Sequence, residues 1–121
     1  MQHWVTICSI DAKVLLYDSL PMKTLPDEIR KEIIALYGKD PTSMIVTIPV
    51  VQKQRNRIDC GCFAIAWALH LAMGEKPELM ISDPKQLRPH LIKCFQAKML
   101  TPFLRSLKQS QRTQSKTIEL K

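Results

Sequence analysis

The stretch RIDCGCFAIAWALHL, residues 57–71, sets a charged approach directly against a long apolar run, with a cysteine at the junction. From Asp59 the pattern is apolar on nearly every side for about four turns, and Gly74 ends it. A helix that is hydrophobic all round is buried. The stretch therefore predicts the central helix of the domain, with Cys60 at its N-terminus.

That position suits a reactive thiol. Unpaired N–H groups and the positive end of the helix dipole stabilise a thiolate at a helix N-terminus, and Lys53, Arg55 and Arg57 add positive potential nearby. The alternative is an inert buried cysteine, the usual state of this residue type. That alternative describes the remaining cysteines better than Cys60; they are Cys8, Cys62 and Cys94.

Length and composition indicate one globular domain. The chain has 121 residues, 45% of them hydrophobic and 24% charged, which argues against wholesale disorder. No apolar run reaches the roughly 18 residues of a spanning helix, so no membrane association is expected. Without a secretory signal, the four cysteines favour a reducing, intracellular compartment over a disulfide framework.

The charge is concentrated at the C-terminal end. Residues 105–121 hold five basic side chains and one acidic one, which is +4 of the formal net charge of +7. The sequence predicts a domain at 1–104 and a basic, disordered tail at 105–121. A tail of this kind can touch nucleic acid or direct nuclear import, but a solvated terminus is the preferred interpretation, and nucleic acid is not an expected partner.

Two short apolar runs begin the chain. HWVTICSI (3–10) and KVLLYDSL (13–20) flank a turn-like segment, which predicts an antiparallel hairpin. The outer ends of such a hairpin meet, so His3 is expected beside Asp18.

The remaining pattern predicts two more helices and a strand. A helix from Pro26 to Gly38 shows an apolar face, and a strand at 44–51 contains Pro49, which favours an edge or a bulge. A last helix begins with Asp83 as N-cap, Pro84 at N1 and Gln86 at N3, and Pro89 need not break it.

No metal or cofactor is expected. Zinc sites use paired cysteines and histidines at matching spacing, whereas the C-x-C pair here is accompanied only by His70 and His90 on later helices.

A nucleophilic cysteine needs a base to take its proton and a third group to orient that base. The predicted hairpin supplies His3 as the base and Asp18 as the orienting group. Together with a cysteine at a helix start, the two residues suggest a catalytic site, although each is a weak signal alone.

Several motifs resemble the ubiquitin-like-protein-specific cysteine proteases, the group that contains the SUMO proteases and the adenovirus proteinase. The motifs are HW at 3–4, YDSL at 17–20, Gln54 six positions before the cysteine, and DCGCFA at 59–64. The segment QLRPHLIKCFQ (86–96) is similar to the C-terminal helix of transposon-associated domains of this type. The resemblance runs from His3 to about Phe103.

The resemblance implies a role for each matching residue. Cys60 would attack the carbonyl after the C-terminal Gly-Gly of a ubiquitin-like modifier, and His3, oriented by Asp18, would be general base and then acid. Gln54 would donate to the oxyanion together with the Cys60 N–H; Gln52 is the rival, and spacing favours Gln54.

Two further residues match the substrate channel of the family. Trp4 matches a tryptophan that closes over the glycine tail, although a core tryptophan on a strand is an equal alternative. Gly61 matches a glycine whose small size suits close approach of the substrate. The implied fold is α+β of the papain-like cysteine protease type, with a small, mainly antiparallel sheet against the helix that presents the cysteine.

The chain departs from the family at its start. Family domains carry a substantial segment before the histidine, which here is residue 3, so the chain resembles the C-terminal part of a catalytic domain. Two functions follow. One is a thiol protease acting on SUMO-like or related modifiers in the nucleus or cytoplasm, and the other is an inactive remnant that acts as a protein-binding module.

Overall fold

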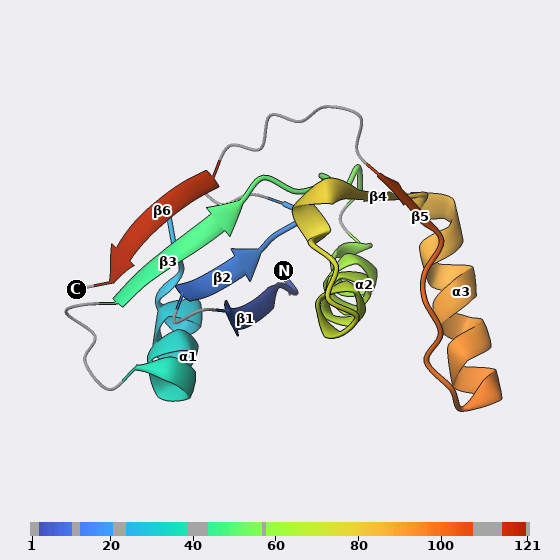
Figure 1. The fold of residues 1–121 in the computed structure, drawn as a ribbon, viewed down its shortest axis with the longest axis horizontal. Helices are drawn as coiled ribbons and strands as arrows, with labels where there is room; N and C mark the ends of the chain where they lie inside the picture. The colour runs from blue at the N-terminus through green and yellow to red at the C-terminus, as the bar shows by residue number, and fades with distance from the viewer. Residues whose placement is uncertain are drawn as a thin grey trace.

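The computed structural model describes residues 3–10, 13–20, 24–38, 44–56, 58–107 and 115–120. Within them the chain is a small α+β domain with three α-helices and two small sheets (Figure 1). The elements in chain order are β1 (Thr6–Ile10), β2 (Lys13–Tyr17), α1 (Asp27–Tyr37), β3 (Met44–Pro49), α2 (Cys60–Ala72), the short 3₁₀ helix η2 (Pro77–Leu79), β4 (Met80–Ser82), α3 (Pro84–Ala97), β5 (Arg105–Leu107) and β6 (Ser115–Leu120). No helix in these ranges is long and apolar enough to cross a bilayer.

The N-terminal hairpin is present, and its strands are shorter than predicted. β1 and β2 pair antiparallel from Thr6 with Tyr17 to Ile10 with Lys13. Residues 3–5 and 18–20 continue beyond the paired part. They still converge, because the outer ends of an antiparallel pair meet, and the side chains of His3 and Asp18 are in contact.

The larger sheet has the order β1-β2-β3-β6. β1 and β2 pair antiparallel, β3 runs parallel to β2, and β6 pairs antiparallel with β3, so two of the three pairings in this sheet are antiparallel. The prediction that Pro49 marks an edge strand or a bulge is wrong, because β3 lies between two neighbours. Pro49 is instead the last residue of the strand, where a missing N–H disturbs the ladder least.

The tail expected to be disordered contains two strands. Arg105–Leu107 pairs with β4, and Ser115–Leu120 pairs along the whole of β3 (Figure 1). Composition indicated disorder because the segment is polar and basic. Strand pairing uses backbone N–H and C=O groups, which composition does not report, so an open edge on β3 can order such a segment.

Two apolar clusters hold the helices to the sheet. Val14 and Leu16 pack with Ile33 of α1, whereas Leu15 and Tyr17 belong to the cluster around α2. Neighbouring side chains on a strand point to opposite faces, so these two clusters lie on opposite faces of β2.

The α2 cluster is the larger core. Phe63 and Trp67 lie one turn apart with ring centroids 5.4 Å apart, and Tyr17 contacts Trp67 across from the sheet. The prediction that α2 is buried is confirmed for the face that carries Phe63 and Trp67. It fails on another side, where Ile65 and Ala68 are exposed.

The last helix begins as predicted. The Asp83 carboxylate accepts a hydrogen bond from the Lys85 N–H at 3.0 Å, Pro84 opens the helix, and α3 continues through Pro89 to Ala97. α3 packs against α2, and β4 pairs with β5 in the smaller sheet (Figure 1).

Candidate active site

His3 and Asp18 form the first part of the site. His3 Nε2 lies 2.5 Å from Asp18 Oδ1, and the two side chains are 16% and 2% exposed. The same carboxylate oxygen accepts the backbone N–H of Leu20 at 2.9 Å. The carboxylate is therefore anchored to its own loop and fixes the direction of the imidazole ring.

The other ring nitrogen of His3 remains available. Among the described residues, His3 Nδ1 is buried and has no hydrogen-bond partner, and the same holds for Asp18 Oδ2. When Nε2–H donates to Asp18, Nδ1 carries the lone pair. The ring can then accept a proton at Nδ1 while Asp18 balances the charge it acquires.

Cys60 is the first residue of α2, as predicted; its thiol is free, and the residue as a whole is 5% exposed. Trp4 lies against the next residue: its Cδ1 atom is 3.6 Å from the position that a Cβ on Gly61 would take. The residue after His3 thus packs on the residue after Cys60. The structure brings the N-terminal segment and the cysteine helix together at this point.

The geometry also tests why residue 61 is glycine. A Cβ at 3.6 Å from Trp4 would be in ordinary van der Waals contact, so Trp4 alone does not require a glycine.

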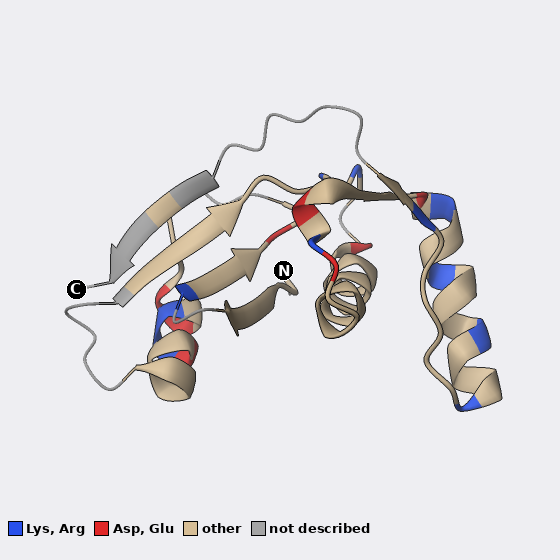
Figure 2. Ribbon diagram, in the orientation of Figure 1, with Lys and Arg blue, Asp and Glu red and all other residues tan. Residues whose placement is uncertain are grey.

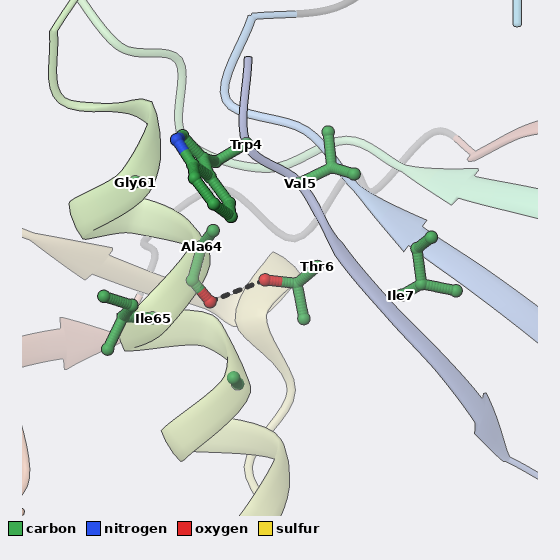
Figure 3. A pocket seen from close by; sticks show the side chains of 8 residues that line it. Trp4, Val5, Thr6, Ile7, Gly61, Ala64 and Ile65 are labelled. Atoms are coloured by element: carbon green, nitrogen blue, oxygen red, sulfur yellow. Dashed lines mark hydrogen bonds between the residues drawn. The ribbon is translucent and has the colours of Figure 1, made fainter. Parts of the chain in front are cut away.

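Trp4 is 60% exposed, so the interpretation as a core tryptophan is wrong. It lies at one end of an apolar groove of about 410 Å³ between the N-terminal strand and α2 (Figure 3). We call this the Trp4 groove; its lining residues are Trp4, Val5, Thr6, Ile7, Gly61, Ala64, Ile65 and Ala68. It begins beside the N-terminus of α2 and follows the helix.

Gln54, which spacing favours for the oxyanion role, and its rival Gln52 have different hydrogen-bond partners. The Gln54 N–H donates to the Ser19 carbonyl at 2.8 Å, and the Ser19 hydroxyl donates to Gln54 Oε1. Gln54 is therefore fastened to the residue that follows Asp18. Its Nε2 donates to the Asn56 carbonyl, and an amide nitrogen carries a second N–H.

Gln52 is engaged elsewhere. Its Nε2 donates to the Ser82 carbonyl at 2.7 Å, and its Oε1 accepts the Ser82 N–H at 2.8 Å. These two bonds connect the segment between β3 and α2 to the last residue of β4. Gln54 is the glutamine that the tertiary contacts join to the His3–Asp18 end of the hairpin.

Sequence reasoning gave no role to three polar residues that bond to the loop before Cys60: Ser19, Asn56 and Arg88. Asn56 in the loop before α2 is typical of a side chain that bonds to its own backbone, and that signal was present. Nothing in the sequence connected Arg88 to the loop. Of the basic residues expected to add positive potential, Lys53 and Arg55 are exposed, and Arg57 lies outside the described residues.

The other thiols have a different environment. Burial raises the pKa of Cys62 and also that of Cys8, to which Glu78 adds. Cys94 is buried within 3.7 Å of the Thr101 hydroxyl. Across the described part of the chain, no three His, Cys, Asp or Glu side chains are grouped as metal ligands.

Comparison with protein families, with curated proteins and with solved structures finds no match to this chain.

Proposed function

We propose that this chain is a cysteine peptidase or isopeptidase that cleaves after the C-terminal Gly-Gly of a ubiquitin-like modifier. The observation that carries the proposal is the part-buried His3–Asp18 pair, with His3 Nδ1 unpartnered among the described residues, together with the packing of Trp4, the residue after His3, on Gly61, the residue after Cys60. A thiol, an imidazole and a carboxylate of this kind are the parts that acyl transfer by cysteine requires.

Each group has one role in the proposed reaction. His3 Nδ1 takes the thiol proton, and the Cys60 sulfur attacks the carbonyl carbon of the terminal glycine. The tetrahedral oxyanion accepts hydrogen bonds from the Cys60 N–H and the second N–H of Gln54 Nε2. His3 then gives its proton to the leaving amine, which leaves a thioester that water hydrolyses with His3 again as base.

The substrate class rests on the motif resemblance. The HW, YDSL, Gln54 and DCGCFA elements occur in the order found in proteases of ubiquitin-like modifiers. Exposed Trp4 beside Gly61 is compatible with a channel that admits only a chain without side chains. We extend the proposal to a papain-like arrangement, since a helix presents the cysteine beside a sheet whose first strand follows the histidine.

A second candidate is a binding module without turnover. The Trp4 groove favours it, because an exposed tryptophan at the end of an apolar groove is suited to hold a partner whether or not Cys60 reacts.

One experiment separates these candidates. The folded chain is incubated with vinyl sulfone probes that carry the C-terminal Gly-Gly of ubiquitin or of SUMO, and adducts are detected by intact mass. We expect an adduct on the parent chain, none on Cys60→Ala, slowed labelling on His3→Ala, and unchanged labelling on the matched thiol control Cys94→Ala. The probe that labels the chain faster identifies the modifier.

Two other results would change the conclusion. Tight binding of a probe without an adduct would replace the peptidase with the binding module. Neither adduct nor binding, on a chain whose circular dichroism shows a folded protein, would remove both candidates.

A further inference from the structure

Asp59 stands at the N-cap position of α2, yet its side chain makes no capping hydrogen bond. An aspartate there ordinarily accepts the backbone N–H of the second or third helical residue. Here Oδ2 accepts from Asn56 Nδ2 at 2.7 Å, and Oδ1 accepts from Arg88 Nη2 at 3.2 Å. Neither oxygen accepts an N–H of the first turn of α2.

Arg88 reaches this loop from α3. Its Nη2 also donates to the Ile58 carbonyl at 3.1 Å. One guanidinium group therefore holds a backbone carbonyl and a side chain in the two residues that precede Cys60. The Asp59 side chain is 12% exposed and that of Arg88 is 53% exposed, so the carboxylate is nearly enclosed while the guanidinium covers it from outside.

Asn56 completes the arrangement from within the loop. Its Oδ1 accepts the backbone N–H groups of Ile58 and Asp59, both at 3.0 Å. The Asp59 carbonyl then accepts the Phe63 N–H at 3.0 Å, the first bond of the helix. The path of the chain into α2 is set by bonds on both sides of Asp59.

This arrangement bears on the neighbouring cysteine in two ways. A capping carboxylate would occupy N–H groups that otherwise face a thiolate or an oxyanion. An unbalanced carboxylate one residue away would also repel a thiolate. The charges of Arg88 and Asp59 both act on the first turn of α2. Burial raises the pKa of Cys62, Arg88 lowers it, and Asp59 raises it further.

We propose that Arg88 is a positioning residue of the candidate active site. It holds the Asp59 carboxylate off the N-terminus of α2 and balances its charge, which leaves the helix N–H groups to the Cys60 thiolate. The inference rests on the proposed function, in that Cys60 is taken as the nucleophile.

Several titratable or charged groups border the first turn and contribute to its field. They are Asp59 in the loop, Cys60 and Cys62 in α2 and Arg88 in α3. The loop before α2 also carries the exposed Lys53 and Arg55, and the ends of the hairpin carry His3 and Asp18. α3 carries no acidic residue between Pro84 and Ala97, and Figure 2 shows its ribbon marked only by Lys and Arg there. Lys93 of α3 is exposed, so Lys93→Met removes the same charge from the same helix as a matched control.

The test measures the rate of Cys60 alkylation by iodoacetamide from pH 5 to pH 9, with peptide-level mass spectrometry to identify the modified thiol. We expect Arg88→Met to slow alkylation at pH 7 by roughly three- to tenfold and to move the pH–rate profile upward. Asp59→Asn in the Arg88→Met background should return the rate to within about twofold of the parent, because the charge that needed balancing is gone. Arg88→Lys should recover part of the rate, and Lys93→Met should match the parent.

Two outcomes would overturn the inference. One is an unchanged pH–rate profile in Arg88→Met. The other is a slowed Arg88→Met that Asp59→Asn does not rescue, which would indicate a merely structural contact. Alkylation uses no modifier substrate, so an Arg88 effect on a chain that no Gly-Gly probe labels would refute the peptidase proposal and leave this one standing.

Discussion

The Thr6 hydroxyl donates a hydrogen bond to the backbone carbonyl of Ala64 at 2.6 Å, which joins β1 to α2 across 58 positions of sequence (Figure 3). Thr6 follows His3 and Trp4 by a few residues, and Ala64 lies one turn after Cys60. This bond therefore helps to set the distance between the candidate base and the candidate nucleophile.

Replacement of Thr6 by valine keeps the shape of the side chain and removes the hydroxyl. We expect the free energy of unfolding in urea to fall by about 1 kcal/mol, since a buried hydrogen bond is lost without a cavity. We also expect slower labelling of Cys60 by the Gly-Gly probe, because strand and helix are less firmly held. Thr6→Ser retains the hydroxyl and should label like the parent; equal rates in all three proteins would show that the bond does not position the site.

Replacement of Asp18 by asparagine removes the negative charge that orients His3. If the pair acts in catalysis, the labelling rate should drop by about 10²- to 10⁴-fold while the fold is retained, because a carboxamide no longer fixes the productive tautomer. Asp27→Asn, at the exposed start of α1, is the matched control and should label normally. A fully active Asp18→Asn would exclude this carboxylate from the mechanism.

His70 gives the domain a predictable pH dependence. It is fully buried, neither ring nitrogen has a hydrogen-bond partner among the described residues, and burial lowers its pKa from 6.5. Below pH 6.5 the unfolded chain binds a proton at this residue that the folded chain excludes. Above pH 6.5 His70 is neutral in both the folded and the unfolded chain, so its titration costs no stability. As the pH falls from 6.5 toward the lowered folded pKa, the free energy of unfolding decreases by up to about 1.4 kcal/mol per pH unit.

Urea unfolding at pH 7.5 and pH 5.5 measures this effect. The free energy of unfolding of the parent should be lower at pH 5.5, and the difference should shrink in His70→Leu. His90→Leu, which removes a partly exposed imidazole, is the comparison variant. A pH dependence that survives His70→Leu in full would assign it to other groups.

Removal of residues 115–121 tests the pairing of β6 with β3. If residues 115–121 were a solvated tail, their removal would not change stability. If they form a paired strand, their removal leaves backbone N–H and C=O groups of β3 without their partners. We expect a lower free energy of unfolding and faster hydrogen exchange at the β3 amides, such as Val46. Removal of Lys121 alone is the control, and unchanged exchange after the longer deletion would contradict the pairing.

The core around α2 offers a separate test of packing. Trp67 is 2% exposed and contacts both Phe63 and Tyr17. Trp67→Ala should cost about 3–5 kcal/mol of stability, and Trp67→Phe should cost less because it leaves a smaller cavity. Chemical unfolding measures both, and a small loss for the alanine variant would mean that the ring is not enclosed.

Local pattern was sufficient for much of the fold. The alternation of residues 3–20 predicted the hairpin, and antiparallel geometry then placed His3 beside Asp18. Asp83 and Pro84 marked the start of α3, and the change of pattern at Asp59 marked the start of α2 at Cys60. These features depend on contacts between near neighbours in sequence, so a single chain segment contains the information.

Other features depended on contacts between distant segments. The different partners of Gln54 and Gln52, which are Ser19 and Ser82, came from such contacts, and the exposure of Trp4 came from the packing of β1 beside α2. Order in residues 115–120 came from an open edge on β3, although their composition is that of a tail.

The sequence by itself determined where the helices begin and which residues are candidates for chemistry, because caps, periodicity and turns act over a few residues. Only the tertiary structure decided what surrounds those residues. The guanidinium of Arg88, 29 positions after Asp59, is an example: no local pattern predicts that bond, since it exists only once α3 has packed against α2.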